Sequence, residues 1–453
     1  MAEQANTVAV IGGGWAGCSA AAELAAAGCK VTLFEAARSL GGRARGVEVH
    51  GTMLDNGQHI MLGAYRETMR LMRQVGVDPA AAMHRLPLQM RYPAGCGGMD
   101  FLAPRLPAPL HLLAALLRAS GLAVADKRSL ARFSTSARWM DWTLYTDCSV
   151  TELLERFGQT ERLCRLMWRP LCLAALNTPP ERASAQVFLN VLRDSLGAKA
   201  AASDMLLPKR DLGTLFPLAA ASYLEARGGK LRTGAKVVSL AQAGQRWQVE
   251  ASGSAVGGNW LAIFDAVVLA TPPAAAAVLL QKLPGCPLAA SLTAFEHEPI
   301  TTCYLQYRPG TRLDLPFYAL PDDGATGNWG QFVFDRGQLD PAQDGLWSVV
   351  VSASAEAAAL DQGQLARAIA VQLAAVMARP ALVQPAWVQV ITEKRATFAC
   401  TPGLARPPNA SGLPGLVLAG DYTAGDYPAT LEAAVRSGVQ AAALLRAFHR
   451  PIR

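Results

Sequence analysis

The stretch TVAVIGGGWAGCSAAAELAAAGCKVTLFEA, residues 7–36, places a glycine-rich pattern between two short apolar runs. Residues 8–11 and 31–34 have the length and composition of buried strands. Residues 15–27 are rich in alanine and end at Gly28, which is typical of a helix with a glycine C-cap. The order strand, helix, strand predicts a βαβ unit that opens an α/β domain.

The glycines of this stretch have the spacing G-x-G-x-x-G, at Gly12, Gly14 and Gly17. The first glycine permits a tight turn, the second lets the backbone approach a pyrophosphate, and the third lets helix and strand pack closely. The helix N-terminus then presents free N–H groups to the phosphates. Glu35 ends the second strand, where an acid accepts hydrogen bonds from a ribose. Together these features predict a dinucleotide site.

Two further motifs resemble the flavin contacts of the amine oxidase and phytoene desaturase superfamily. They are ARSLGGRAR, residues 37–45, and GLVLAGDYTAGDYPATLEAAVRSGVQAA, residues 415–442. The resemblance implies FAD, held along its pyrophosphate by the first motif and along its ribityl chain and pyrimidine by the second. It also implies a backbone contact to the adenine between the two motifs. The residues that match these positions are Gly42, Arg43, Val237, Gly420, Asp421, Ala429, Thr430 and Leu431.

The flavin motifs lie near opposite ends of the 453-residue chain, which is long enough for two or three domains. We therefore predict an α/β fold, with a Rossmann-like FAD-binding domain and an inserted α+β substrate domain. The FAD-binding domain is expected to be discontinuous, over residues 1–75, 211–289 and 405–453. Residues 76–210 and 290–404 are expected to form the substrate-binding, membrane-facing domain.

Composition narrows the range of partners. Hydrophobic residues make up 51% of the chain and charged residues 17%, so apolar surface is expected for a lipid or a membrane. The net charge of +7 is spread over single basic residues, which favours an anionic membrane surface over nucleic acid. The nine cysteines form no C-x-x-C pair, so neither a disulfide framework nor a metal site is predicted. A reducing cytoplasm is the expected compartment.

One apolar segment, LPAPLHLLAALLRASGLAVA, residues 106–125, has basic residues on both sides. Two interpretations fit it: a buried helix of the second domain, or a helix that lies in the membrane interface. No run of 18 apolar residues occurs, so no spanning helix is predicted. We expect peripheral association with the inner face of the cell membrane.

The two flavin motifs, the segment LDNGQHIMLG at residues 54–63 and the apolar middle of the chain together resemble the squalene-associated branch of the superfamily. Its members are the bacterial hydroxysqualene dehydroxylases of hopanoid synthesis. The resemblance implies an isoprenoid lipid substrate of thirty carbons and reductive loss of its hydroxyl to give squalene. A carotenoid desaturase, a flavin amine oxidase and a non-enzymatic prenyl-lipid-binding protein are the alternatives. The electron donor is not indicated, since no second dinucleotide fingerprint is present.

The segment LDNGQHIMLG also places polar side chains next to apolar ones. A plain turn is one interpretation, because Gly57 lies within the cluster. The other is catalytic: His59 titrates near neutral pH, and Asp55 would orient it or, if burial raised its own pKa, act as the acid. We hypothesise that His59 and Asp55 assist departure of the substrate hydroxyl as water. Asp426 and Tyr427 are the next candidates.

Overall fold

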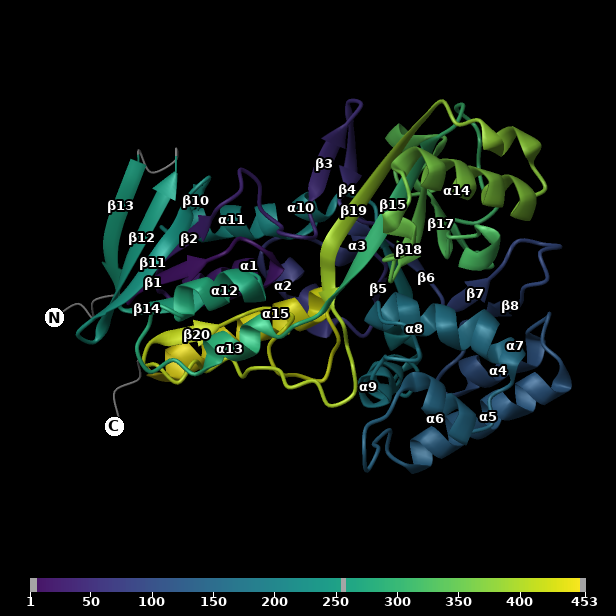
Figure 1. Cartoon of the computed structure of the whole chain (residues 1–453), viewed down its shortest axis with the longest axis horizontal. Coiled ribbons are helices and arrows are strands. Elements are labelled where there is room, and N and C mark those ends of the chain that lie inside the picture. Colours follow the sequence, from purple (N-terminus) through teal and green to yellow (C-terminus); the bar gives the residue numbers. More distant parts are fainter. Residues whose placement is uncertain (1–5, 254–257, 449–453) are drawn as a thin grey trace.

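The computed structural model describes residues 6–253 and 258–448. A five-stranded parallel sheet in the order β10-β2-β1-β14-β20 lies at one end of the molecule (Figure 1). Its strands are β1 Thr7–Ile11, β2 Lys30–Glu35, β10 Lys230–Thr233, β14 Ala266–Leu269 and β20 Leu416–Leu418. All five strands fall within the three segments predicted to form the FAD-binding domain.

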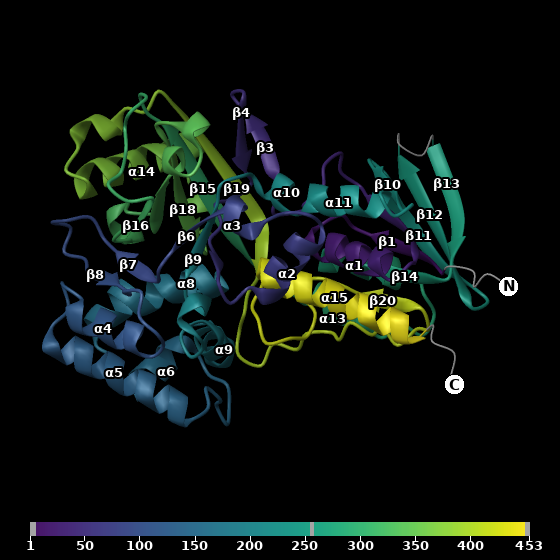
Figure 2. The same ribbon diagram turned by 180° about the vertical axis from the view of Figure 1, so that it is seen from behind.

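Helix α1, Trp15–Ala26, links β1 to β2 and packs against α15, Leu431–Phe448, and α11, Pro217–Glu225. Small residues let α1 and α15 approach closely, since a Cβ at Gly438 in α15 would lie 2.2 Å from the carbonyl oxygen of Ala16 in α1. An antiparallel sheet lies beside the parallel one (Figure 2). Its strands are β11 Lys236–Ala243, β12 Arg246–Gly253 and β13 Gly258–Phe264, and helices α12 Pro273–Leu280 and α13 Leu288–Thr293 follow.

The other end of the molecule holds a second five-stranded sheet, in the order β16-β17-β18-β15-β19 (Figure 1). Its strands are antiparallel, and α14, Gln362–Val376, packs its buried leucines and isoleucine against them. The strands are β15 His297–Gln306, β16 Phe317–Ala319, β17 Phe332–Asp335, β18 Leu346–Ser352 and β19 Trp387–Phe398.

A block of helices lies below this sheet (Figure 1). Its members are α4 Leu110–Arg118, α5 Val124–Trp139, α6 Val150–Arg156, α7 Glu161–Leu163, α8 Arg169–Leu176 and α9 Ala185–Ser195. A π-helical turn, Cys164–Trp168, joins α7 to α8. Such turns widen a helix locally and are frequent at functional sites.

The remaining strands and α-helices are short. They are the hairpin β3 Gly46–Val49 and β4 Thr52–Asp55, the sheet of β5 Met61–Leu62, β9 Met205–Pro208 and β6 Met83–Leu86, the hairpin β7 Gln89–Arg91 and β8 Asp100–Leu102, and helices α2 Arg66–Gln74, α3 Pro79–Ala82 and α10 Leu212–Leu215. The division into two domains at the predicted residue boundaries stays a prediction.

The apolar segment 106–125 forms one short helix and the start of another. Helix α4 ends at Arg118, and α5 begins at Val124. Gly121 lies between them with a positive φ of 76°, where a Cβ would approach the Gly98 carbonyl oxygen to 2.3 Å. Within the described residues, no helix has the length and apolar character needed to cross a membrane.

Candidate functional site

A cavity of about 500 Å³ begins at the carboxyl end of β1 and runs to the N-terminus of α15. This is the edge at which open parallel sheets bind their ligands. Ten of the residues predicted to bind the cofactor line it: Gly12, Gly14, Glu35, Gly42, Arg43, Gly420, Asp421, Ala429, Thr430 and Leu431.

The glycines have the geometry that their spacing predicts. Gly12 has a φ of 109°, and a Cβ there would lie 2.4 Å from the carbonyl oxygen of Ala270. A Cβ at Gly17 would lie 1.9 Å from the carbonyl oxygen of Gly12, so this glycine holds α1 against the turn. Gly14 differs, because a Cβ there would meet no atom within 4 Å. The open side of the backbone at Gly14 is thus available to a ligand.

Glu35 is fixed by the backbone in the wall of the cavity at the end of β2. Its carboxylate accepts hydrogen bonds from the N–H groups of Gly13 and Ala37, both at 2.7 Å. A carboxylate offers about four lone-pair positions, so two remain for a ribose diol. Val237, by contrast, is buried and is not among the residues that line the cavity.

Arg43 and Asp421 form an ion pair in the middle of the cavity, with Nη2 and Oδ1 2.7 Å apart. Arg43 also donates to the carbonyl oxygen of Ala396 at 2.8 Å. Burial opposes the charge on Arg43, yet Asp421 raises the pKa of the guanidinium. The buried hydroxyl of Thr271 lines the same cavity and has no hydrogen-bond partner in the described part of the chain, which fits a site whose ligand supplies one.

Helix α15 presents its first turn to the cavity. Ala429, Thr430 and Leu431 line it, so the positive end of the helix dipole faces the space that a flavin pyrimidine would fill. Glu432 points away, where its fully buried carboxylate accepts hydrogen bonds from the N–H groups of Glu67 and Thr68. This contact ties α15 to the start of α2.

The polar residues at the end of β4 and just after it face two different surroundings. Residues 56–60 line the cavity, and Nδ1 of His59 lies 2.6 Å from the carbonyl oxygen of Gly57. That hydrogen bond, with Nδ1 donating, leaves Nε2 as the atom that exchanges protons. Burial lowers the pKa of His59, so its neutral form is favoured. Its role as a proton donor stays a prediction.

Asp55 does not take part in this arrangement, and the predicted pairing with His59 is corrected here. Burial does raise the pKa of Asp55 to about 6. However, Asp55 is not among the cavity-lining residues, and its carboxylate accepts from the N–H of Leu212 at 2.8 Å. The end of the strand explains the difference: Asp55 is the last residue of β4 and faces the start of α10, whereas residues 56–60 have left the strand and line the cavity.

A second cavity, of about 470 Å³, extends from the first into the helical block. The two share six lining residues: Ile60, Tyr65, Ala174, Ala175, Phe332 and Thr430. We call this shared region the junction. The second cavity is mainly apolar, and the π-helical turn contributes Met167 and Trp168 to its wall. Its polar lining includes Asp194 and Tyr427; sequence reasoning missed Asp194 and named Tyr427 only as a reserve candidate.

Comparison with protein families gives a match to the model described as flavin containing amine oxidoreductase, over residues 15–446. The chain belongs to the flavin-containing amine oxidoreductase family. A redesigned putrescine oxidase has the same fold, with a TM-score of 0.72 over 98% of this chain and 99% of that one, at 15% identity. The parallel sheet and the cavity at its edge are therefore those of a flavin oxidoreductase.

Within the family, two similar relatives share one name. The hydroxysqualene dehydroxylase of Rhodopseudomonas palustris is 31% identical, over 98% of this chain and 99% of the relative. That of Sinorhizobium fredii is 30% identical, over 97% and 98%. The zeta-carotene desaturase of a Synechocystis strain is more distant, at 24% identity over 96% of each chain. The chain is thus a flavin-dependent oxidoreductase.

Proposed function

We propose that this chain is an FAD-dependent oxidoreductase that reductively removes the hydroxyl of hydroxysqualene to give squalene. The observation that carries the proposal is the apolar cavity that opens at the junction directly onto the flavin site. The name shared by two full-length relatives of about 30% identity supports the same substrate.

FAD fits the first cavity better than a shorter flavin. Glu35 lies at one end of it, where a ribose would bind, and Thr430 at the other. A flavin mononucleotide would leave Glu35 and the open backbone of Gly14 without a ligand. A dinucleotide would reach both, and the N–H groups at the N-terminus of α1 would hold its phosphates.

The walls of the second cavity suit a hydrocarbon chain. They include leucine, methionine, phenylalanine and tryptophan side chains from the helical block and from the strands and loops around it. No lysine lines either cavity within the described residues, which disfavours the lysine-held water expected of an amine oxidase. A carotenoid desaturase remains the second candidate, because a relative with that name also matches nearly the whole chain.

The reaction replaces a C–O bond by a C–H bond and releases water. Bound in its reduced state, the flavin supplies a hydride, and the hydroxyl needs one proton to leave as water. Nε2 of His59 is the predicted proton source, in a cavity lined by the segment that carries it. The apolar walls exclude water, so a positively charged carbon would meet few competing nucleophiles.

Anaerobic turnover tests the function. Protein reduced with dithionite is mixed with hydroxysqualene, phytoene or a simple amine, and flavin reoxidation and products are followed. We expect reoxidation by hydroxysqualene with squalene as the product. Squalene formation at the rate of a flavin-free control would overturn the proposal. Enzyme-dependent desaturation of phytoene by the oxidised protein, without dehydroxylation, would establish the second candidate.

We also propose peripheral association with a membrane surface. Helix α4 has two faces: Leu112 and Leu116 line the apolar cavity, while Leu110 and Leu117 are 52% and 67% exposed. Lys127, in α5, is among the basic residues nearby that suit an anionic lipid surface. The helix thus separates the cavity from the exposed apolar face, and a lipid substrate would have a short path between them.

A further inference from the structure

The second cavity contains one carboxylate among its described lining residues, that of Asp194 in α9. Its other charged lining residue, Arg138, is exposed. A carboxylate in a mainly apolar wall is costly unless hydrogen bonds compensate it. Its position in the wall of a cavity that meets the flavin cavity at the junction therefore calls for a functional explanation.

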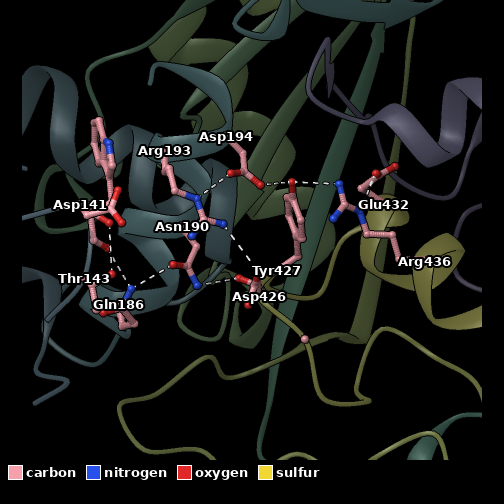
Figure 3. Close-up of polar contacts among 12 residues, drawn as sticks. Asp141, Thr143, Gln186, Asn190, Arg193, Asp194, Asp426, Tyr427, Glu432 and Arg436 are labelled. Atoms are coloured by element: carbon pink, nitrogen blue, oxygen red, sulfur yellow. Dashed lines mark hydrogen bonds and ion pairs between the residues drawn. The ribbon is translucent and has the colours of Figure 1, made fainter. Parts of the chain in front are cut away.

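Asp194 is held by a network that joins the helical block to the flavin-binding end (Figure 3). Its Oδ1 accepts from Nε of Arg193 at 2.8 Å, and its Oδ2 accepts from the hydroxyl of Tyr427 at 2.5 Å. Arg436, from α15, donates to the Tyr427 hydroxyl at 3.3 Å and lies over its ring. Asn190 donates to the carbonyl oxygen of Asp426 at 3.1 Å, which fixes α9 against the same loop.

Neighbouring groups determine the protonation states of Asp194 and Tyr427. Burial opposes ionisation of Asp194, but hydrogen bonds from Arg193 and Tyr427 hold its pKa below the usual range. Burial and the contact with Asp194 raise the pKa of Tyr427, so the phenol stays neutral and donates its single proton to the carboxylate. Asp194 is therefore an ionised acceptor.

Asp194 still has capacity for a ligand. Two of its roughly four lone-pair positions are used, and 27% of its side-chain surface is accessible. Tyr427, which also lines the cavity, lies three residues before Thr430 of the junction. An alcohol in the second cavity would thus meet an acceptor for its O–H, in a cavity that opens onto the flavin site at the junction.

We propose that Asp194, positioned by Tyr427 and Arg193, binds the hydroxyl of the substrate and selects the alcohol over the corresponding hydrocarbon. This inference rests on the proposed function and deepens it by assigning the group that recognises the alcohol. An ionised carboxylate accepts the hydroxyl proton but supplies none, so the leaving group's proton comes from elsewhere.

The selection has a physical basis in the lipid environment. The hydrocarbon chain gains little on moving from a bilayer into an apolar cavity, since both surroundings are equally apolar. Substrate and product then differ in affinity mainly through the hydroxyl. A hydrogen bond to a charged acceptor favours the alcohol by on the order of 10- to 100-fold.

Binding to the oxidised holoenzyme tests this without turnover. Hydroxysqualene and squalene, dispersed in the same detergent, are titrated while the flavin absorbance is recorded. We expect the parent to bind the alcohol at least tenfold more tightly. Asp194→Asn should lose most of that preference while its squalene affinity and flavin content stay the same. Tyr427→Phe should lose part of it, because the carboxylate loses its positioning partner.

The matched control is Asp426→Asn. Asp426 also contacts Arg193, at 3.6 Å, but its side chain is 67% exposed and it does not line the cavity. This variant should keep the parent's preference.

The inference is overturned if the parent binds hydroxysqualene and squalene equally tightly, or if Asp194→Asn still prefers the alcohol. The comparison of the two ligands on the parent remains a test even if the variant does not fold. Anaerobic turnover by the parent decides the proposed function separately, so the two failures are distinguishable.

Discussion

Gly14 offers the sharpest test of where the cofactor's phosphates lie. Its backbone is extended, with φ −73° and ψ 178°, which valine adopts without strain. A Cβ at this position meets no atom within 4 Å, and Gly14 lines the flavin cavity. The valine side chain of Gly14→Val would therefore fill space that the ligand needs, without a clash with protein atoms at its Cβ.

Two opposite effects follow from this geometry. The free energy of unfolding of the flavin-free protein should stay the same or rise by about 0.4–1 kcal/mol, because the unfolded chain loses freedom. FAD binding should weaken, because the pyrophosphate loses its close approach to the backbone. Loss of one hydrogen bond to a charged group, roughly 1.5–3 kcal/mol, corresponds to an increase in Kd of about 10- to 150-fold.

Both quantities are measured on apoprotein prepared by removing the flavin. Urea unfolding gives the stability, and quenching of flavin fluorescence gives the Kd for FAD. Gly17→Ala is the matched control, since its Cβ would lie 1.9 Å from the carbonyl oxygen of Gly12 and should cost folding itself. A Gly14→Val protein that binds FAD like the parent would refute the placement of the phosphates.

His59→Ala should keep the flavin and slow its reoxidation by substrate ~10²–10⁴-fold if Nε2 delivers the proton. Because burial lowers the His59 pKa, the rate of the parent should rise as pH falls below 6.5. A His59→Ala rate equal to the parent's excludes this donor. The double variant Leu110→Ser/Leu117→Ser should sediment less with anionic liposomes at unchanged flavin content, whereas the cavity-lining Leu112→Ser should sediment like the parent. Equal sedimentation of the parent, the double variant and Leu112→Ser excludes α4 as the membrane contact. Burial raises the Asp55 pKa from 3.8 to about 6, so the native state binds more protons than the unfolded chain in that window. The free energy of unfolding should then fall by roughly 3 kcal/mol as pH rises through the window. Asp55→Asn should abolish this slope in urea titrations, and a slope equal to the parent's would contradict the assignment.

The sequence could predict the flavin cavity because its signals are local. A positive φ at Gly12 and an open side at Gly14 follow from the spacing of glycines between two strands. Glu35 ends the second strand, and its position relative to Gly13 is set by the pairing of β1 with β2. Each of these features needs only neighbouring residues and one strand register.

The errors arose where side-chain direction depends on tertiary contacts. Asp55 and His59 are four residues apart, yet the strand ends between them and their side chains face different surroundings. The segment 106–125 was expected to be a single helix, although Gly121 already indicated the break between α4 and α5. A glycine break is a signal that the sequence contains, whereas the point at which β4 ends is fixed by its pairing with β3.

Asp194 is different in kind. It lies 233 residues before Tyr427 in the chain, and nothing around it in the sequence forms a motif. Only the packing of α9 against the loop before α15 brings the carboxylate to the phenol. A single sequence does not encode that contact in any local pattern, so the structure was needed to find it.

The residues predicted from local motifs and the residue found only in the structure have different chemical roles. The flavin cavity supplies reducing power, which related oxidoreductases use on different substrates, and its residues are readable from short motifs. The second cavity supplies selectivity, and an apolar wall alone distinguishes poorly between hydrocarbon chains that are already dissolved in a bilayer. Discrimination then depends on one buried polar contact, since leaving a hydroxyl unpaired in such a wall costs more than a change in chain shape. A carboxylate acceptor in the wall of the second cavity is what a dehydroxylase needs and a desaturase, whose substrate has no hydroxyl, does not.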